Sequence, residues 1–217
     1  MEINISNAEF IKVRTEWCKF SIDVVHGIQV KRIALGYSQE DLSFLLGKPA
    51  NYICQIEHFL PKKEYYALDI FRLAQIFYCK PKDLFTIKSL QSNRVTIGIY
   101  QYSDNYAIKY YEAYSFQENK IILLYHLTEH IQCSYGLKSI RSSLKECIDG
   151  LLHTTFFDEG EEAWYIFKYC TTILKSPFRP KHLIEALHTF TQDENHKLKM
   201  IWDDGRAFFV KLANSQN

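Results

Sequence analysis

The spacing of hydrophobic residues separates a helical first part of the chain from an extended middle. Between Asn7 and Ile87 apolar residues recur at the intervals of amphipathic helices, so this part is predicted to be all-helical. From Arg94 to His130 the spacing changes to alternation, in segments rich in tyrosine, isoleucine and valine. Joined by two short polar connectors, these segments predict a three-stranded antiparallel meander with strands at residues 95–102, 106–116 and 120–130.

Helical spacing returns after the meander and predicts three amphipathic helices and a hairpin. The helices are expected near residues 137–151, 163–170 and 183–190. Asp158 with Glu161 indicates a capping box before the second helix, and Pro180 suits the first turn of the third. The segment 203–205, Asp-Asp-Gly, lies between two apolar stretches and predicts the hairpin, because Asp-Gly favours the tight turn between antiparallel strands.

A helix-turn-helix is indicated between Gly36 and Glu57. Ser38 is an N-cap candidate with Asp41 three residues later, so a helix is predicted to begin there. Gly47 can adopt the left-handed conformation that ends this helix and redirects the chain into a second one. The predicted buried positions are Leu42, Leu45 and Leu46 on the first helix and Ile53 and Ile56 on the second.

With its flanking residues, this motif resembles the Cro and phage-repressor type of helix-turn-helix family, often called XRE-like, across residues 22–86. The flanking residues that carry the likeness are Ile28, Arg32, Ile33, residues 65–70, Leu73, Ala74, Ile76 and residues 81–85. The resemblance implies a domain of five helices, in which the helix that opens at Ala50 lies in the major groove of DNA.

The resemblance also implies which residues contact DNA. Ala50, Asn51 and Gln55 would meet base edges, because Asn and Gln can bond bidentately to adenine and an alanine methyl can pack on a thymine methyl. Gln39 would bond a phosphate or a flanking base, and lysines would contact phosphates. The predicted DNA-binding set is Gln39, Lys48, Pro49, Ala50, Asn51, Tyr52, Gln55, Lys62 and Lys63.

The order of three helices and a hairpin in the second half resembles a winged helix. Residues 181–190 would then form its recognition helix, with Lys181 and His182 on the exposed face. A possible second DNA contact therefore comprises Arg179, Lys181, His182 and Arg206.

Together these patterns predict an α+β fold that is mainly α. A five-helix N-terminal helix-turn-helix domain would be followed by a three-stranded antiparallel meander and a winged-helix-like helical C-terminal domain. The predicted segments are an N-terminal helical extension at 1–21, the helix-turn-helix domain at 22–87, and a C-terminal α+β domain at 93–217 that holds the meander at 95–130 and the winged-helix-like part at 137–212.

Charge and composition exclude several classes of function. The 217 residues carry 26 Lys and Arg against 25 Asp and Glu, so any DNA binding must depend on a local surface. Six cysteines without a Cys-x-x-Cys pair argue against a zinc ribbon. No apolar run is long enough to cross a bilayer and the first ten residues lack the pattern of a secretory signal, so a cytoplasmic protein without membrane contact is expected.

One short motif offers an enzymatic alternative. The segment 126–130 reads His-Leu-Thr-Glu-His and matches the His-x-x-Glu-His pattern of inverzincin metalloproteases. The same segment is predicted to be a strand, which would hold His126 and His130 too far apart to share a zinc ion. We therefore expect no enzyme activity, no metal and no cofactor.

The sequence thus predicts a repressor-like, sequence-specific transcriptional regulator that binds double-stranded DNA as a homodimer. The tyrosine-rich meander could supply the dimer contact, or its rings could cover neighbouring helices of the same chain. The alternative is a protein-interaction module, or an antitoxin-like regulator, that docks a protein partner through Phe59, Leu60 and the tyrosine-rich sheet. The sequence identifies no small-molecule effector.

Overall fold

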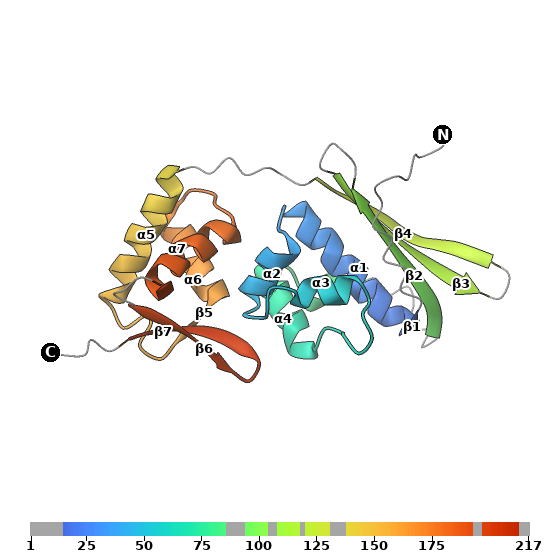
Figure 1. Ribbon diagram of the computed structural model, residues 1–217, viewed down its shortest axis with the longest axis horizontal. Coiled ribbons are helices and arrows are strands. Elements are labelled where there is room, and N and C mark those ends of the chain that lie inside the picture. The colour runs from blue at the N-terminus through green and yellow to red at the C-terminus, as the bar shows by residue number, and fades with distance from the viewer. Residues whose placement is uncertain are drawn as a thin grey trace. The chain divides into compact units, whose positions relative to one another are not determined.

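The computed structural model describes residues 15–85, 94–103, 108–117, 120–130, 138–192 and 197–212 (Figure 1). The chain forms two compact units, each made from two stretches. The first unit is Met1–Gly36 with Ile53–Ser134, and the second is Tyr37–Tyr52 with Tyr135–Asn217. The predicted helix-turn-helix residues therefore contribute to both units, and the predicted boundary at 87–93 lies outside the described residues.

The first unit combines helices with a four-stranded antiparallel sheet. Its helices are α1 (Lys19–Ala34), α3 (Tyr52–Glu57, in this unit from Ile53 on), α4 (Ala67–Ile76) and the 3-10 helix η1 (Pro81–Leu84). Its strands are β1 (Thr15–Cys18), β2 (Arg94–Ser103), β3 (Ile108–Gln117) and β4 (Lys120–His130), in the order β1-β2-β3-β4.

The inner face of this sheet forms a core with α1 (Figure 1). Side chains alternate between the two faces of a strand, and the buried pair Ile99 and Ala113 marks the inner face of β2 and β3. On α1 the ring of His26 stacks on Tyr125 of β4, with 4.5 Å between the ring centres. The buried apolar residues of α1 are Ile22, Val24, Val25 and Ile28.

The predicted fold class is wrong. The described residues hold seven α-helices and two antiparallel sheets, not five helices followed by a three-stranded meander. Thr15–Cys18, predicted within a helical extension, is a strand that pairs with β2, and the predicted fifth helix is the short 3-10 helix η1. Four residues are too few to show a period, and β1 is specified by its partner: Trp17, which is 4% exposed, lies opposite Val95 far along the chain.

The second unit packs helices against a three-stranded antiparallel sheet. Its helices are α2 (Gln39–Leu45), α5 (Lys138–Leu152), α6 (Ala163–Leu174) and α7 (Pro180–Gln192). Its strands are β5 (Glu161–Glu162), β6 (Leu198–Asp203) and β7 (Arg206–Lys211), in the order β5-β7-β6. The three C-terminal helices and the hairpin follow one another as predicted, and β5 is an addition that the sequence did not indicate.

Two local predictions in this unit have opposite outcomes. The hairpin turn is confirmed, since Asp204 and Gly205 adopt positive φ angles of 44° and 69° between paired strands. The capping box of Asp158 and Glu161 is wrong, because Glu161 pairs with Phe209 in the sheet and α6 begins after Glu162 without a side-chain cap. Glu161 is therefore part of strand β5, paired with β7, and not part of the first turn of a helix. Across the described residues, no helix is both long and apolar enough to cross a bilayer.

Candidate nucleic-acid interface

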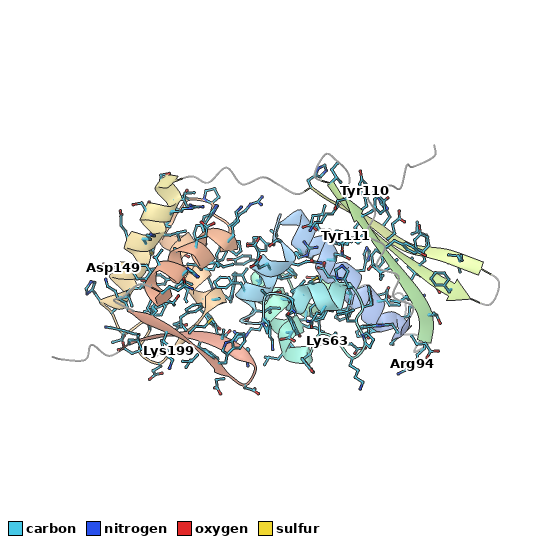
Figure 2. All side chains as sticks on the ribbon, viewed as in Figure 1. Lys63, Arg94, Tyr110, Tyr111, Asp149 and Lys199 are labelled. Carbon is cyan, nitrogen blue, oxygen red and sulfur yellow. The ribbon has the colours of Figure 1, made fainter. Side chains whose placement is uncertain are left out.

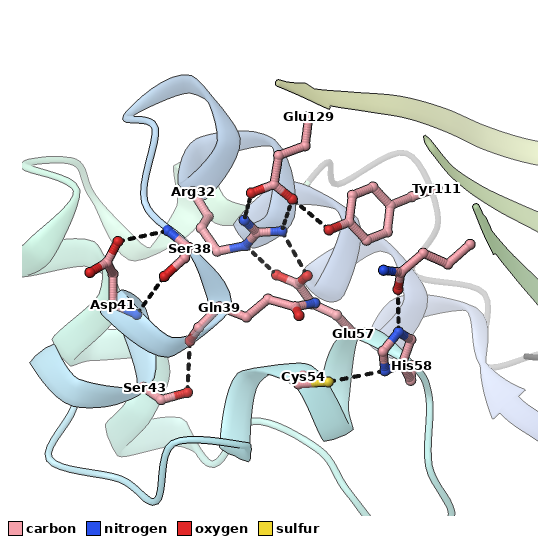
Figure 3. A network of polar contacts seen from close by, with 11 residues as sticks. Arg32, Ser38, Gln39, Asp41, Ser43, Cys54, Glu57, His58, Tyr111 and Glu129 are labelled. Carbon is pink, nitrogen blue, oxygen red and sulfur yellow. Dashed lines mark hydrogen bonds and ion pairs between the residues drawn. The ribbon is translucent and has the colours of Figure 1, made fainter. Parts of the chain in front are cut away.

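Helix α2 begins at a capping box, as predicted. The hydroxyl of Ser38 accepts a hydrogen bond from the backbone N–H of Asp41 at 2.9 Å, and the Asp41 carboxylate accepts one from the N–H of Ser38 at the same distance (Figure 3). These two bonds satisfy backbone donors that the first turn of a helix leaves free. The start of α2 is therefore fixed by residues three positions apart.

The turn after α2 depends on Gly47. Its φ of 65° is left-handed, as predicted, and its carbonyl accepts the backbone N–H of Ala207 from β7 at 2.8 Å. A Cβ at position 47 would lie 3.1 Å and 3.2 Å from the carbonyl oxygen and nitrogen of Ala207. Glycine therefore serves both the conformation of the turn and the close approach of β7.

The apolar side of α2 is anchored within the second unit. Leu42, Leu45 and Leu46 are buried, as predicted. Phe44 makes an edge contact with Phe209 of β7 at 6.3 Å between ring centres. Residues of the C-terminal stretch thus hold α2 in this unit.

The predicted base-contacting residues Ala50 and Asn51 lie in an exposed turn together with Pro49. Helix α3 begins at Tyr52 and not at Ala50, because the carbonyl of Pro49 accepts the N–H of Tyr52 at 2.8 Å and closes a separate turn first. Lys48, also in the predicted set, lies beside Tyr52 with its Nζ 5.4 Å from the ring centre. Gln39 is half-buried in the first turn of α2, and its carbonyl accepts the hydroxyl of Ser43 at 2.8 Å.

The remaining predicted residues of the set belong to the first unit. Gln55 is half-buried on α3, and Lys62 and Lys63 are exposed in the segment that follows it. Lys63 is labelled in Figure 2. Phe59, which the alternative hypothesis places at a protein-docking surface, is wrong in that role. Its side chain is 0% exposed and packs edge-on against Trp17, with 4.9 Å between the ring centres, and its backbone has a left-handed φ of 51°.

A buried charge cluster fixes the end of α3 (Figure 3). Arg32 of α1 donates to the carboxylate of Glu57, the last residue of α3, at 2.7 Å and 2.9 Å. The same guanidinium donates to Glu129 of β4 at 2.7 Å and 3.2 Å, and the hydroxyl of Tyr111 donates to Glu129 as well. The side chains of Arg32 and Glu57 are fully buried, so bulk water does not contact this ion pair.

The electrostatics of this cluster keep Glu129 ionised. Burial alone would raise the pKa of the Glu129 carboxyl, but hydrogen bonds and charge from Arg32, with the bond from Tyr111, hold it below its ordinary value. Burial and the neighbouring Glu129 raise the pKa of the Tyr111 hydroxyl, which therefore remains a donor. The sequence offered one signal for this cluster: Arg32 lies four positions after Ile28, on the apolar side of α1.

The His-x-x-Glu-His segment lies on a strand, as predicted, and its residues point to opposite faces of the sheet. Glu129 faces inward to Arg32, whereas the Nδ1 of His126 lies 3.2 Å from Glu112 on the outer face. In the part of the chain that the structure describes, no group of three or more potential metal-ligating side chains is gathered.

The possible second DNA contact is only partly exposed. His182 is wrong as an exposed residue, since it is 8% exposed and its Nδ1 accepts the backbone N–H of Arg179 at 3.1 Å, ahead of α7. Arg206 donates to Glu162 at 3.2 Å, and Arg179 and Lys181 are half-buried. Capping at the start of α7 and an ion pair beside β5 are the observed roles of His182 and Arg206.

The outer face of the four-stranded sheet carries four tyrosines around Glu112, which we call the tyrosine cluster: Tyr100, Tyr102, Tyr110 and Tyr114. Tyr102 stacks on Tyr110 at 4.7 Å, and Tyr114 donates to Glu112 at 2.7 Å, a bond that raises the pKa of this tyrosine to about 12. Tyr111, by contrast, faces the core. The prediction that tyrosine rings pack within the chain is therefore confirmed for Tyr111, and a dimer contact through the outer face stays a prediction.

Chemically, the exposed turn offers hydrogen-bonding and apolar groups of the kinds that read base edges. The Asn51 amide can donate and accept at adenine, and the Ala50 methyl can pack on thymine. The structure gathers Lys48, Pro49, Ala50 and Asn51 in one turn of the second unit and assigns Gln55, Lys62 and Lys63 to the first. Comparison of the chain with protein-family models, with curated proteins and with solved structures gives no match.

Proposed function

We propose that this protein is a cytoplasmic, repressor-like transcriptional regulator that binds double-stranded DNA with sequence specificity. The observation that carries the proposal is the exposed turn Pro49–Ala50–Asn51, which follows a helix fixed by the Ser38 capping box and the left-handed Gly47. An ordered helix that leads into exposed small and amide side chains supports the insertion of that turn into a major groove.

In this proposal the residues divide into readers and positioners. Asn51 and Gln55 form hydrogen bonds with base edges and Ala50 contacts a thymine methyl, which gives sequence preference. Lys48, Lys62 and Lys63 contact phosphates, which gives affinity without preference. Because the chain carries a net charge of only +1, phosphate contacts from a few lysines leave non-specific binding weak.

The protein acts as a homodimer in this proposal, because two copies can read two half-sites one DNA turn apart. The tyrosine cluster supports a contact between copies, since aromatic residues are enriched at interface cores. Next to it on the outer face of the sheet, Ile121 and Leu123 of β4 are 69% and 51% exposed. An interface that covered these side chains would remove apolar surface from water.

Single substitutions separate the two kinds of contact on a duplex enriched from a random pool. Asn51→Ala or Gln55→Ala should cost about 1–3 kcal/mol of binding free energy and relax the preference at one base pair. Lys48→Ala should weaken binding to all duplexes about equally and lower the slope of log K against log salt by about 1. Titration by fluorescence anisotropy at several salt concentrations measures both effects.

Lys199→Ala is the matched control for these titrations. Lys199 is an exposed lysine on β6 outside the predicted set (Figure 2), so its replacement should leave affinity and salt slope unchanged. If Asn51→Ala and Gln55→Ala both behave like Lys199→Ala, the turn and α3 do not read bases and the proposal fails.

A further inference from the structure

Helix α3 carries a thiol paired with an imidazole. The Sγ of Cys54 lies 3.2 Å from the Nδ1 of His58, four residues later in the chain. The other ring nitrogen of His58, Nε2, is hydrogen-bonded to the Oε1 of Gln101 on β2. A thiol on α3, an imidazole in the turn directly after α3 (Figure 3) and an amide oxygen on β2 thus lie in contact within the first unit, the arrangement by which a base and a group that orients it activate a nucleophile.

The contact with Gln101 determines what His58 can do. An amide oxygen accepts a hydrogen bond, so the ring carries its proton on Nε2, and Nδ1 is left to accept the proton of the Cys54 thiol. Burial alone would lower the pKa of His58, but hydrogen bonds to Cys54 and Gln101 raise it. An imidazole that readily holds a proton stabilises a neighbouring thiolate, which is the reactive form of cysteine.

The environment of Cys54 differs from that of the other cysteines that the structure describes. Cys54 is half-buried, whereas Cys170 is buried with its Sγ 3.6 Å from the Sγ of Cys147. Cys79 is half-buried like Cys54, but burial raises its pKa, and no imidazole among the described residues is hydrogen-bonded to it. Cys79 is therefore the natural internal control for the effect of His58.

We propose that Cys54 is a reactive modification site, activated by His58 and oriented by Gln101, whose substrates are small hydroperoxides. The sulfur attacks the terminal oxygen, an S–O bond forms, and the O–O bond breaks. The thiol proton held on His58 passes to the departing oxygen, which leaves as an alcohol, or as water from hydrogen peroxide. The sulfur is oxidised by two electrons to a sulfenic acid and the peroxide is reduced by two.

Modification of Cys54 also has a consequence for DNA binding. The residue directly precedes Gln55 on α3, so an adduct at Cys54 should weaken binding to a specific duplex. This consequence rests on the proposed function, whereas the reactivity of the thiol does not.

The test is a competition between cysteines in the same folded chain. The full-length protein at pH 7 is treated briefly with limiting iodoacetamide, quenched and digested, and the carbamidomethyl fraction at each cysteine is measured by mass spectrometry. Cys54 should react at least about tenfold faster than Cys79, a threshold set below the roughly 10²- to 10⁴-fold that a positioned general base typically contributes. With hydrogen peroxide and the sulfenic acid trap dimedone, the label should appear on Cys54 before Cys79.

Two variants assign the reactivity to the neighbours of Cys54. His58→Gln should bring the Cys54 rate down toward that of Cys79, and Gln101→Leu should lower it while His58 is still present. The rates at Cys79 and at the buried Cys170 should not change. If the rates at Cys79 and Cys170 rise in His58→Gln, that variant is partly unfolded. The Cys54 rate in Gln101→Leu then tests the proposal. A Cys54 rate equal to that of Cys79 in the native protein, or one unchanged by Gln101→Leu, overturns the proposal. Neither result depends on DNA.

Discussion

The two helices of the predicted helix-turn-helix are held by different interactions. Helix α2 is held by a capping box between Ser38 and Asp41, by leucine packing, and by one backbone hydrogen bond that β7 donates to the Gly47 carbonyl. Helix α3 is held by buried charge, through the bonds of Glu57 to Arg32 and of Arg32 to Glu129. The start and end of α2 are therefore determined mainly by residues near in sequence. Helix α3 depends instead on Arg32 of α1 and Glu129 of β4, which are 25 and 72 positions away from Glu57.

Replacing Arg32 should have the largest effect on stability. Arg32→Met leaves Glu57 buried without its cation, and removing one partner of a buried pair typically costs about 3–5 kcal/mol. Urea unfolding followed by far-UV circular dichroism measures the loss. The control is Arg94→Met: the Arg94–Glu16 pair is 4.0 Å long and mostly exposed, so its removal should cost less than about 1 kcal/mol (Figure 2). Equal losses in the two variants would contradict the role given to buried charge.

Replacing Glu129 should have the next largest effect, and one that depends on pH. Glu129→Gln weakens charged hydrogen bonds from Arg32 and should cost about 2 kcal/mol at pH 7. Because the folded protein holds the pKa of Glu129 below its unfolded value, the carboxylate stabilises the fold above that unfolded value. This stabilisation is lost as pH falls through the folded pKa.

The unfolding free energies of wild type and Glu129→Gln should therefore converge as pH falls below about 4. Urea unfolding at intervals from pH 7 to pH 3 tests the convergence. A difference that stays constant over this range would show that the Glu129 carboxylate has no such role.

A smaller effect is expected at the turn after α2. Gly47→Ala and Gly205→Ala share the strain of a left-handed backbone, but only the Cβ at position 47 meets backbone atoms, those of Ala207. Gly205→Ala should cost about 1 kcal/mol and Gly47→Ala about 2 kcal/mol. Thermal and urea unfolding measure both, and a loss at Gly47 no greater than at Gly205 would remove the argument for close packing against β7.

The same contrast explains what the sequence could predict. The Ser38 capping box, the left-handed Gly47 and the Asp204-Gly205 hairpin were predicted because each depends on residues within a few positions of one another. Strand β1 was not predicted, because its partner β2 is about 80 residues away and four residues show no period.

The sequence likewise predicted only those parts of the candidate site that depend on residues close together along the chain. The exposed turn with Ala50 and Asn51 was named from the motif, but its register was not, because α3 starts two residues later than expected. The burial of Phe59 depends on Trp17 and a left-handed backbone, and the pairing of His58 with Gln101 joins two distant segments. The spacing of residues along the chain does not reveal contacts between such distant segments.

The most direct test of the proposed function is selection from a random pool of DNA duplexes with the intact protein, at low and at physiological salt. The proposal predicts enrichment of a palindromic sequence at both salt concentrations, and loss of its base preference when Asn51 and Gln55 are both replaced by alanine. Weak binding with no enriched sequence at either salt concentration would contradict the central claim that this chain reads DNA.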